Sequence, residues 1–355
     1  MKLNLTRGCF DSTKRELLTH GGITVHALKY RSGVEALEVR NSRVSFIFTP
    51  FKGQQVWHFT VDGNDLSMKT TIKEPTASSV YLENYGGFLY HCGVISFGVP
   101  DQIHPQHGEL PNITYDTAYI ECSSDERGSY IALGGSVEHN TSFIRRYRFL
   151  PELRLYENGT VLTLTVKLEN LRAYPMEYMY LCHLNFCPIE GATLLTSART
   201  DPEHTKIYKT EINDSLTSYI HTLESDISKM TVVDRASQCY DPELCFGITH
   251  DSDENGRAYT MQYTENGACY VSHPTKELPY SIRWISRTEN EDSMGMVLPC
   301  TAEHLGYDYA KEHGQLKILD PNATLEFTIE AGYLDPKDAD KLKEKIESIN
   351  SFCGR

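Results

Sequence analysis

The sequence predicts an all-β protein, and three observations carry that prediction. Many short segments alternate apolar and polar residues with a period of two, the pattern of half-buried strands. Turn residues separate these segments, as in Glu157-Asn158-Gly159. Only one segment, near the carboxyl end, shows clear helical spacing of apolar residues. Many short strands with one terminal helix are typical of a large antiparallel β-sandwich.

The strands follow one another along almost the whole chain. In Val161 to Leu168, Val161, Thr163 and Thr165 share one face, while Leu162, Leu164, Val166 and Leu168 share the other. We expect strands to make up at least about 40% of the chain, about double the average for soluble domains. The other expected strands are Val44 to Phe48, Ser129 to Leu133, Phe143 to Phe149, Tyr178 to His183, Met230 to Val233, Ala258 to Gln262, Ser281 to Ile285 and Leu325 to Ala331.

A short helix is predicted near the carboxyl end, from Asp338 to Ile349. Asp335 is a candidate N-cap, and Pro336 fits the first helical position. Apolar residues then recur at helical spacing, at Leu342, Ile346 and Ile349. This stripe predicts a face that packs against the sheets.

The composition is that of a globular protein with a sizeable core. Of 355 residues, 40% are hydrophobic and 23% are charged. No repeat or linker divides the sequence, so we expect residues 1–355 to form a single domain. The net charge of −14 argues against a nucleic-acid partner, which needs clustered Lys and Arg. No stretch reaches the roughly 18 apolar residues of a membrane helix, so we expect no membrane partner either.

The cysteines and the amino-terminal segment favour a cytoplasmic location. The ten cysteines are scattered and form no Cys-x-x-Cys pair, which argues against a zinc knuckle or a redox motif. The segment from Met1 to Phe10 lacks the apolar stretch of a secretory signal. We therefore expect reduced thiols, most of them buried.

Two histidines stand in short, unusual frames. His107 lies in the stretch from His104 to Asn112, between a proline and a Gly-Glu pair. His183 ends an apolar strand, shortly before Asn185. Histidine titrates near neutral pH and so can exchange protons with a substrate held in a cleft. The alternative is that each is a core histidine satisfied by backbone groups.

Four sequence blocks follow one another in a distinctive order. They are Tyr85-Gly86-Gly87-Phe88-Leu89-Tyr90-His91-Cys92-Gly93-Val94, then His107-Gly108-Glu109-Leu110-Pro111-Asn112, then Leu168-Glu169-Asn170 with His183-Leu184-Asn185-Phe186, and last Ala331-Gly332-Tyr333-Leu334-Asp335. In this order they resemble an uncharacterised branch of the aldose 1-epimerase (galactose mutarotase-like) superfamily. The resemblance implies a β-supersandwich that binds carbohydrate in a cleft on one sheet.

The resemblance also implies catalytic roles for the reversible opening of a sugar ring. His183 corresponds to the histidine that acts as the acid, and His107 to a supporting histidine. The glutamate that acts as the base has no counterpart, because Leu298 stands at its place. We expect Glu303 to supply the base, with Glu109 as second choice. The neighbouring His304 is a further residue that could contribute.

Substrate contacts are expected from residues with hydrogen-bonding or stacking groups near these blocks. They are Glu109, Asn185, Trp284, Arg283 and Gln54. A metal site remains an alternative, because His and Glu side chains bind divalent ions. Its ligands would be His104, His107, Glu109 and His183; otherwise no cofactor is expected.

Together these features favour a carbohydrate isomerase of the aldose 1-epimerase type, acting on a small-molecule sugar. Two alternatives remain open. One is a non-catalytic carbohydrate-binding protein on the same fold, which the missing glutamate favours. The other is a metal-dependent keto-sugar isomerase or lyase. The sequence leaves the identity of the sugar and the oligomeric state open.

Overall fold

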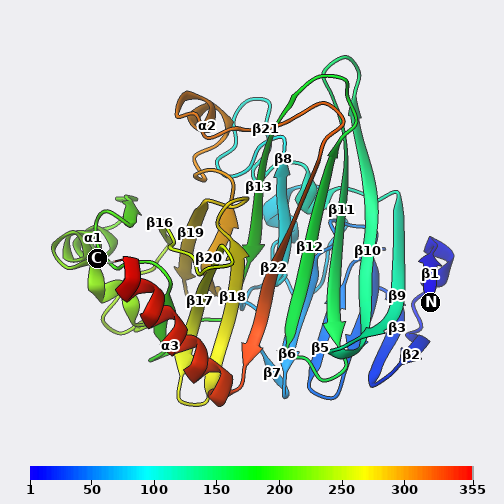
Figure 1. Cartoon of the computed structure of the whole chain (residues 1–355), viewed down its shortest axis with the longest axis horizontal. Coiled ribbons are helices and arrows are strands. Elements are labelled where there is room, and N and C mark those ends of the chain that lie inside the picture. Colours follow the sequence, from blue (N-terminus) through cyan, green and yellow to red (C-terminus); the bar gives the residue numbers. More distant parts are fainter. Residues whose placement is uncertain (354–355) are drawn as a thin grey trace.

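Two large antiparallel sheets pack face to face in the computed structural model, which describes residues 1–353 (Figure 1). Strands make up 47% of the chain and helices 14%, which confirms the predicted all-β class. One sheet has nine strands, in the spatial order β1 (Lys2–Leu5), β9 (Thr117–Asp125), β10 (Gly128–Thr141), β11 (Arg145–Tyr156), β12 (Val161–Asn170), β22 (Thr324–Leu334), β18 (Gly267–Pro274), β17 (Arg257–Thr264) and β14 (Thr193–Thr196).

The second sheet has thirteen strands and carries the candidate site. Eleven of them form a continuous path, and two short strands pair at its side: β21 (Lys317–Leu319) with β13 and β7 (Asn64–Asp65) with β6. The path runs β15 (Thr205–Tyr208), β16 (Leu244–Ile248), β19 (Tyr280–Arg287), β20 (Asp292–Cys300), β13 (Met176–Leu184), β8 (Leu89–Val94), β6 (Val56–Val61), β5 (Val44–Phe48), β4 (Glu35–Arg40), β3 (Ile23–Lys29) and β2 (Arg15–His20).

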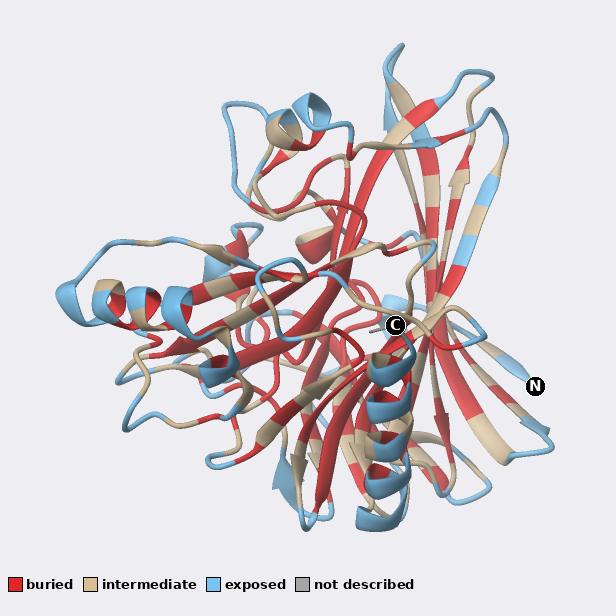
Figure 2. Ribbon diagram, turned by 60° about the vertical axis from the view of Figure 1, so that its left-hand side comes forward, coloured by how far each residue is buried: buried red, intermediate tan, exposed pale blue. Residues whose placement is uncertain are grey.

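Helices are few, as expected, and lie outside the two sheets (Figure 2). They are α1 (Asp214–Ser225), α2 (Tyr307–Glu312) and α3 (Pro336–Cys353), with 3-10 turns η1 (Arg7–Cys9), η2 (Tyr81–Asn84), η3 (Leu110–Asn112) and η4 (Ile227–Thr231). Among residues 1–353, no helix combines the length and the hydropathy needed to cross a membrane. The nine cysteines whose side chains are described are all free thiols.

The core lies between the two sheets and decides which way each strand residue points. His91 on β8 packs against Phe149 of the facing sheet, with ring centroids 5.2 Å apart. Tyr180 on β13 meets Phe327 of that sheet at 5.4 Å. Side chains alternate along a strand, so residues an odd number of positions from Tyr180 face outward. His183, three residues after Tyr180, is one of them. The inner faces are buried, as Figure 2 shows, and their buried residues are mostly apolar.

Most expected strands are confirmed, and one is wrong. The expected strand Val44 to Phe48 is β5, and Val161 to Leu168 lies within β12. Met230 to Val233 instead begins within the 3-10 turn η4 and makes only an isolated bridge, between Thr193 and Val232. The Asp226 side chain accepts a hydrogen bond from Ser228 N at 3.2 Å and so starts the turn.

The sequence prediction missed two helices, α1 and the six-residue α2. The Asn213 side chain caps α1, where its Oδ1 accepts a hydrogen bond from Leu216 N at 2.8 Å. A buried stripe then follows at helical spacing, formed by Leu216, Tyr219, Ile220 and Leu223. Both signals, an Asn cap and a spacing of three and four residues, were present in the sequence.

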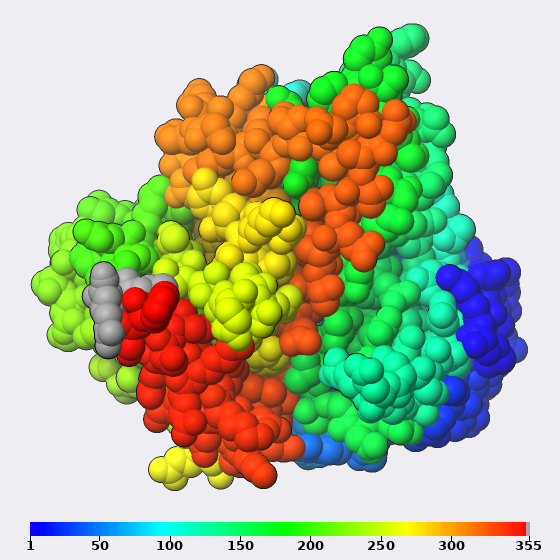
Figure 3. Space-filling view, viewed as in Figure 1, coloured from blue at the N-terminus to red at the C-terminus, as the bar shows by residue number. Residues whose placement is uncertain are grey.

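The carboxyl-terminal helix α3 is confirmed and lies across β17 and β18 (Figure 3). Its buried stripe, Ala339, Leu342, Ile346 and Ile349, packs against Tyr259, Met261 and Tyr270. Lys345 donates to Tyr259 Oη at 2.7 Å. Asp335 does not act as the expected side-chain cap, because both its carboxylate oxygens accept hydrogen bonds from Arg43 at 2.7 Å.

Replacing Ile346 with Ala should destabilise the protein by about 2–4 kcal/mol, because it leaves a cavity under α3. Ile346 is 2% exposed. Urea unfolding followed by circular dichroism measures the change. Glu347→Ala, at an exposed position on the same helix, is the matched control and should stay within about 0.5 kcal/mol of the wild type. Equal stabilities of the two variants would contradict the packing role of α3.

Candidate functional site

A cleft of about 370 Å³ lies on the face of the thirteen-stranded sheet that points away from the other sheet. Its floor consists of alternate residues from neighbouring strands. Loops before β8 and after β8 and β20 form its walls. The floor residues are Leu181 and His183 of β13, Ile282 and Trp284 of β19, Leu298 of β20 and Cys245 of β16.

His183 is the buried polar group of the cleft floor, and its proton position is fixed by Asn185. The Asn185 amide nitrogen donates to Gly87 O at 3.0 Å, so its oxygen faces His183. His183 Nδ1 donates to that oxygen at 2.8 Å. The neutral ring therefore carries its proton on Nδ1, and Nε2 is an acceptor. Tyr85 Oη lies 3.5 Å from Nε2, and its shorter contact is the hydrogen bond that it donates to Asn185 Oδ1 at 3.1 Å.

His107 reaches the same cleft from a tight turn. Its ring centroid lies 5.2 Å from that of His183 and 4.7 Å from that of Tyr81. His107 has a left-handed φ of 60° and is followed by Gly108 at 79°. A side chain on Gly108 would meet Ser96 O at 2.1 Å, so this position requires glycine. The structure thus brings together the two histidines that the sequence singled out.

His304 is a third imidazole in the cleft wall. Its ring packs edge-on against Tyr208 with centroids 4.5 Å apart. Burial lowers the pKa of His304 to about 4, although the negative charge of Glu303 opposes the shift. The sequence analysis had named His304 beside Glu303 as a residue that could contribute to the missing base function.

Burial also favours the neutral form of the other two histidines. It lowers the pKa of His183 to about 4, against the hydrogen bond with Asn185 that raises it. The pKa of His107 falls well below its ordinary value, through burial and the neighbouring charges of His183 and His304. At neutral pH all three rings are therefore uncharged, and each has one donor and one acceptor nitrogen.

Trp284 lines the cleft, whereas Asn185, the other expected substrate contact, is buried beside His183 and is absent from the cleft lining. The Trp284 ring contacts those of His183 at 5.6 Å and Tyr85 at 5.9 Å. Its Nε1 donates to Glu243 Oε2 at 2.7 Å. Glu243 is the one carboxylate among the described residues that line the cleft. Glu243 directly precedes the first residue of β16, and no sequence pattern predicted it as a site residue.

Glu303 lies outside the cleft, on the far side of Tyr208. Its carboxylate accepts hydrogen bonds from Lys206 Nζ and Tyr208 Oη, both at 2.5 Å, and from Gln315 Nε2 at 2.8 Å. Burial of the carboxyl opposes ionisation, but these donors outweigh it and lower its pKa to about 2. The structure therefore does not bring Glu303 together with His183, and it leaves Glu303 a weak proton acceptor.

Glu109, the second choice for the base, is held by the turn that carries His107. Its Oε1 accepts from Val94 N at 2.8 Å, Ile95 N at 3.1 Å and Tyr147 Oη at 2.6 Å. Burial raises its pKa, against the effect of these donors. Glu109 borders a neighbouring hollow and is absent from the lining of the cleft. Its contacts anchor the backbone amides of Val94, the last residue of β8, and Ile95, which follows it.

Arg283 and Gln54, both expected to contact substrate, lie elsewhere. Arg283 adjoins Trp284 on β19, so the strand pleat turns it to the opposite, inner face. It is 1% exposed, and its Nε donates to Met296 O at 3.1 Å. Gln54 is buried, and its amide donates to Pro50 O at 3.3 Å. Neither side chain lines the cleft.

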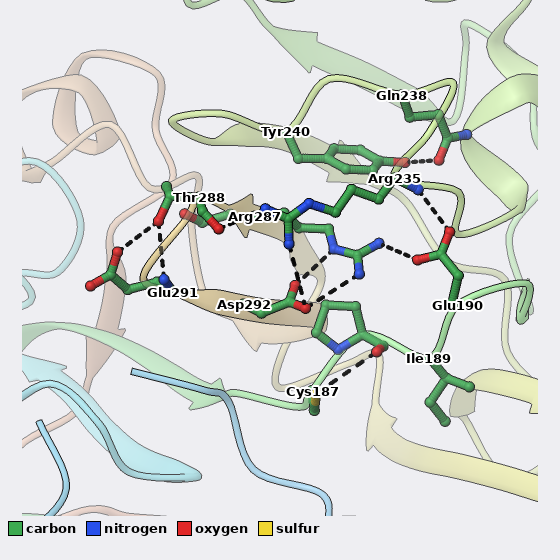
Figure 4. Close-up of polar contacts among 12 residues, drawn as sticks. Cys187, Ile189, Glu190, Arg235, Gln238, Tyr240, Arg287, Thr288, Glu291 and Asp292 are labelled. Carbon is green, nitrogen blue, oxygen red and sulfur yellow. Dashed lines mark hydrogen bonds and ion pairs between the residues drawn. The ribbon is translucent and has the colours of Figure 1, made fainter. Parts of the chain in front are cut away.

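Arg287, on the same strand, is also engaged away from the cleft (Figure 4). Its Nε donates to Asp292 Oδ1 at 2.7 Å, and its Nη1 donates to Glu190 Oε2 at 2.9 Å. These contacts tie β19 to β20 and to the segment after β13. The guanidinium is thus occupied by structural ion pairs.

The four residues of the metal alternative do not converge. His104 Nδ1 lies 2.6 Å from Asp101 Oδ2, and its ring packs on Tyr307 at 4.8 Å. Glu109 is occupied by the amides and the tyrosine named above. Within residues 1–353, no three His, Cys, Asp or Glu side chains gather closely enough to hold a metal ion. His107 and His183 remain together without the other two.

The tautomer and low pKa of His183 predict its behaviour in solution. Its imidazole resonances should shift with a midpoint near pH 4, because burial disfavours the charged ring. Above that pH, nitrogen chemical shifts should place the proton on Nδ1. Heteronuclear NMR of histidine-labelled protein measures both, and His183→Asn identifies the signals. A midpoint between pH 6 and 7 would contradict the burial of this ring.

Glu303→Gln should lower the melting temperature at pH 7, because it removes the charge that pairs with Lys206. The lowered pKa of Glu303 means that its stabilising effect is present above about pH 4.5 and is lost as the pH falls toward 2. The difference in melting temperature between the variant and the wild type should therefore decrease below pH 4.5. Exposed Glu312→Gln is the control. If Glu303 acted as the base, as the sequence analysis expected, the same substitution would lower turnover and leave the melting temperature little changed.

Comparison with known proteins gives the fold independent support. The chain is similar in structure to a "putative aldose 1-epimerase" from Klebsiella pneumoniae, with a TM-score of 0.81, 18% identity and coverage of 99% of this chain and 96% of that one. It is also similar to a galactose mutarotase-like protein from Clostridium acetobutylicum, with a TM-score of 0.56, 14% identity and coverage of 92% and 99%. At these identities the likeness shows the fold, which confirms the predicted galactose mutarotase-like β-supersandwich.

Sequence comparison assigns the family. Among curated proteins, none matches this sequence. A family model described as a domain of unknown function, DUF4432, matches residues 31–332, which is most of the chain. The chain belongs to the DUF4432 family.

Proposed function

We propose that this protein binds a free, uncharged sugar in the cleft and interconverts its anomers by proton transfer. The observation that carries the proposal is His183, a neutral imidazole whose Nδ1 contact with Asn185 at 2.8 Å leaves Nε2 without a proton and so able to accept one. A second imidazole, His107, lies 5.2 Å from it, ring to ring. Ring opening needs one group that takes a proton and another that gives one.

In this proposal His183 acts as the base. Nε2 accepts the proton of the anomeric hydroxyl, the bond from the anomeric carbon to the ring oxygen breaks, and a carbonyl forms. The ring oxygen takes a proton from a second donor, for which His107 and His304 are the candidates. Rotation of the carbonyl group and reversal of the steps give the other anomer. This reverses the role that the sequence resemblance implied for His183, because a ring without a proton on Nε2 cannot donate one there.

The remaining cleft residues suit the recognition of a sugar. Aromatic rings stack on the apolar face of a pyranose, and Trp284 and Tyr85 offer such rings beside His183. Glu243 offers a carboxylate to sugar hydroxyls, and its contact with Trp284 Nε1 at 2.7 Å orients it. The fold shared with galactose mutarotase-like proteins supports the same class of ligand.

Leu298 favours one alternative, a carbohydrate-binding protein without catalysis. It is 2% exposed in the cleft floor and stands where the sequence resemblance expects a glutamate. A cleft without that carboxylate can retain its sugar contacts and lack a strong base. The two functions differ in one measurable quantity, the rate of anomer interconversion.

NMR exchange or polarimetry on a panel of free pentoses and hexoses tests the proposal. For at least one sugar, the wild type should interconvert anomers faster than solvent alone. His183→Asn should lower that rate by roughly 100-fold or more, the scale of losing a general base. His221→Asn, at an exposed position on α1, should leave it unchanged. Binding without acceleration of any sugar would favour the binding protein instead.

A further inference from the structure

A second hollow adjoins the cleft, and we call it the side compartment. It measures about 450 Å³ and lies between the segment of residues 79–82 and the segment of residues 105–113. Tyr81, Leu82 and Gln106 line both the side compartment and the cleft. The two hollows therefore adjoin each other, with Tyr81 and Gln106 at their border.

We propose that the ligand is a reducing disaccharide, with its reacting ring against His183 and its second ring in the side compartment. This inference rests on the proposed function, since it assigns the reacting ring to the same cleft. The rings of His183, His107 and Tyr81 follow one another at 5.2 and 4.7 Å, so they lead from the reacting position to the border. A single monosaccharide at His183 would leave the side compartment empty.

The lining of the side compartment fits an uncharged ring. Val80 and Leu82 are 54% and 58% exposed, and Ile113 lies opposite them across the hollow. Exposed apolar residues around a hollow mark a binding surface, and the C–H face of a sugar can cover them. Polar groups for its hydroxyls are also present in the lining, at Ser79, Gln106 and Asn112.

The charges argue against a phosphorylated or acidic second unit. Among the described residues that line the side compartment there is no Lys or Arg. Its one charged side chain is Glu109, whose carboxylate already accepts from Val94 N, Ile95 N and Tyr147 Oη. A phosphate would find no cation there, whereas a neutral ring avoids any charge repulsion.

The compartment is formed before any ligand binds. Asn84 Nδ2 donates to Asn112 Oδ1 at 2.9 Å, and Asn112 Nδ2 donates to Ser79 O at 3.3 Å. These bonds tie the two walls to each other. At the border, Tyr81 is 7% exposed, and its ring packs against those of His107 and Tyr85 at 4.7 and 4.9 Å. Packed in this way, Tyr81 forms a fixed part of the wall.

Calorimetry with glucose, maltose and cellobiose, within a wider panel of free sugars and reducing disaccharides built from them, tests the inference. At least one disaccharide should bind tenfold or more tightly than its reducing-end monosaccharide. Ser79→Trp places a large ring into the side compartment from an exposed position. It should abolish the advantage of the disaccharide and leave monosaccharide affinity unchanged.

Ala77→Trp is the matched control, because it puts the same bulk on the same segment at an exposed position outside the lining. It should preserve the advantage of the disaccharide. Equal affinity for monosaccharides and disaccharides would overturn this inference and leave the proposed function standing. An advantage that survives Ser79→Trp would also overturn it. If no sugar of the panel binds or reacts, the proposed function fails, and the inference fails with it.

Discussion

The pairing of β13 with β8 is the constraint on which the site depends. His183 lies opposite Tyr90, and Cys182 lies opposite His91, in antiparallel register. The inner positions of both strands are filled by core side chains, so a shift by one residue would turn His183 into the core and Cys182 into the cleft. Burial of the apolar side chains on the inner face therefore determines which residues point outward. His183 points into the cleft because its strand neighbours, such as Cys182, are buried in the core.

Features that depend on local sequence patterns could be predicted, whereas features that depend on contacts between distant residues could not. The strands β5 and β12 and the helix α3 follow from local periodicity, and all were predicted. The missed helix α1 carried the same kind of local signal but lay among polar residues. Arg283 and Trp284 were both expected at the substrate, although adjacent residues on one strand face opposite sides. The alternation of side chains along a strand is therefore enough to exclude one of the two from the cleft.

Other errors arose from contacts that no sequence pattern reveals. Glu303 binds Lys206, which is 97 positions away in the chain, and Glu109 binds Tyr147, which is 38 away. These partners decide whether a carboxylate serves as a base or as a structural acceptor. Glu243 enters the cleft through its contact with Trp284, 41 positions later. The histidine frames succeeded because His107 and His183 are each oriented by their own turn or strand, so their local sequences were sufficient.

Leu298 connects the electrostatics of the cleft with its chemistry. A carboxylate in the cleft floor would favour protonated histidines, because an opposite charge nearby raises their pKa. With leucine there, burial outweighs the groups that oppose it, and the pKa of both His183 and His304 falls to about 4. Leu298 therefore affects the state of its neighbours: imidazoles that a carboxylate at this position would favour in the charged form are neutral acceptors. The floor and the histidines carry no fixed charge at neutral pH, and the two charged side chains of the lining, Glu243 and Lys209, already have partners in Trp284 and Glu224.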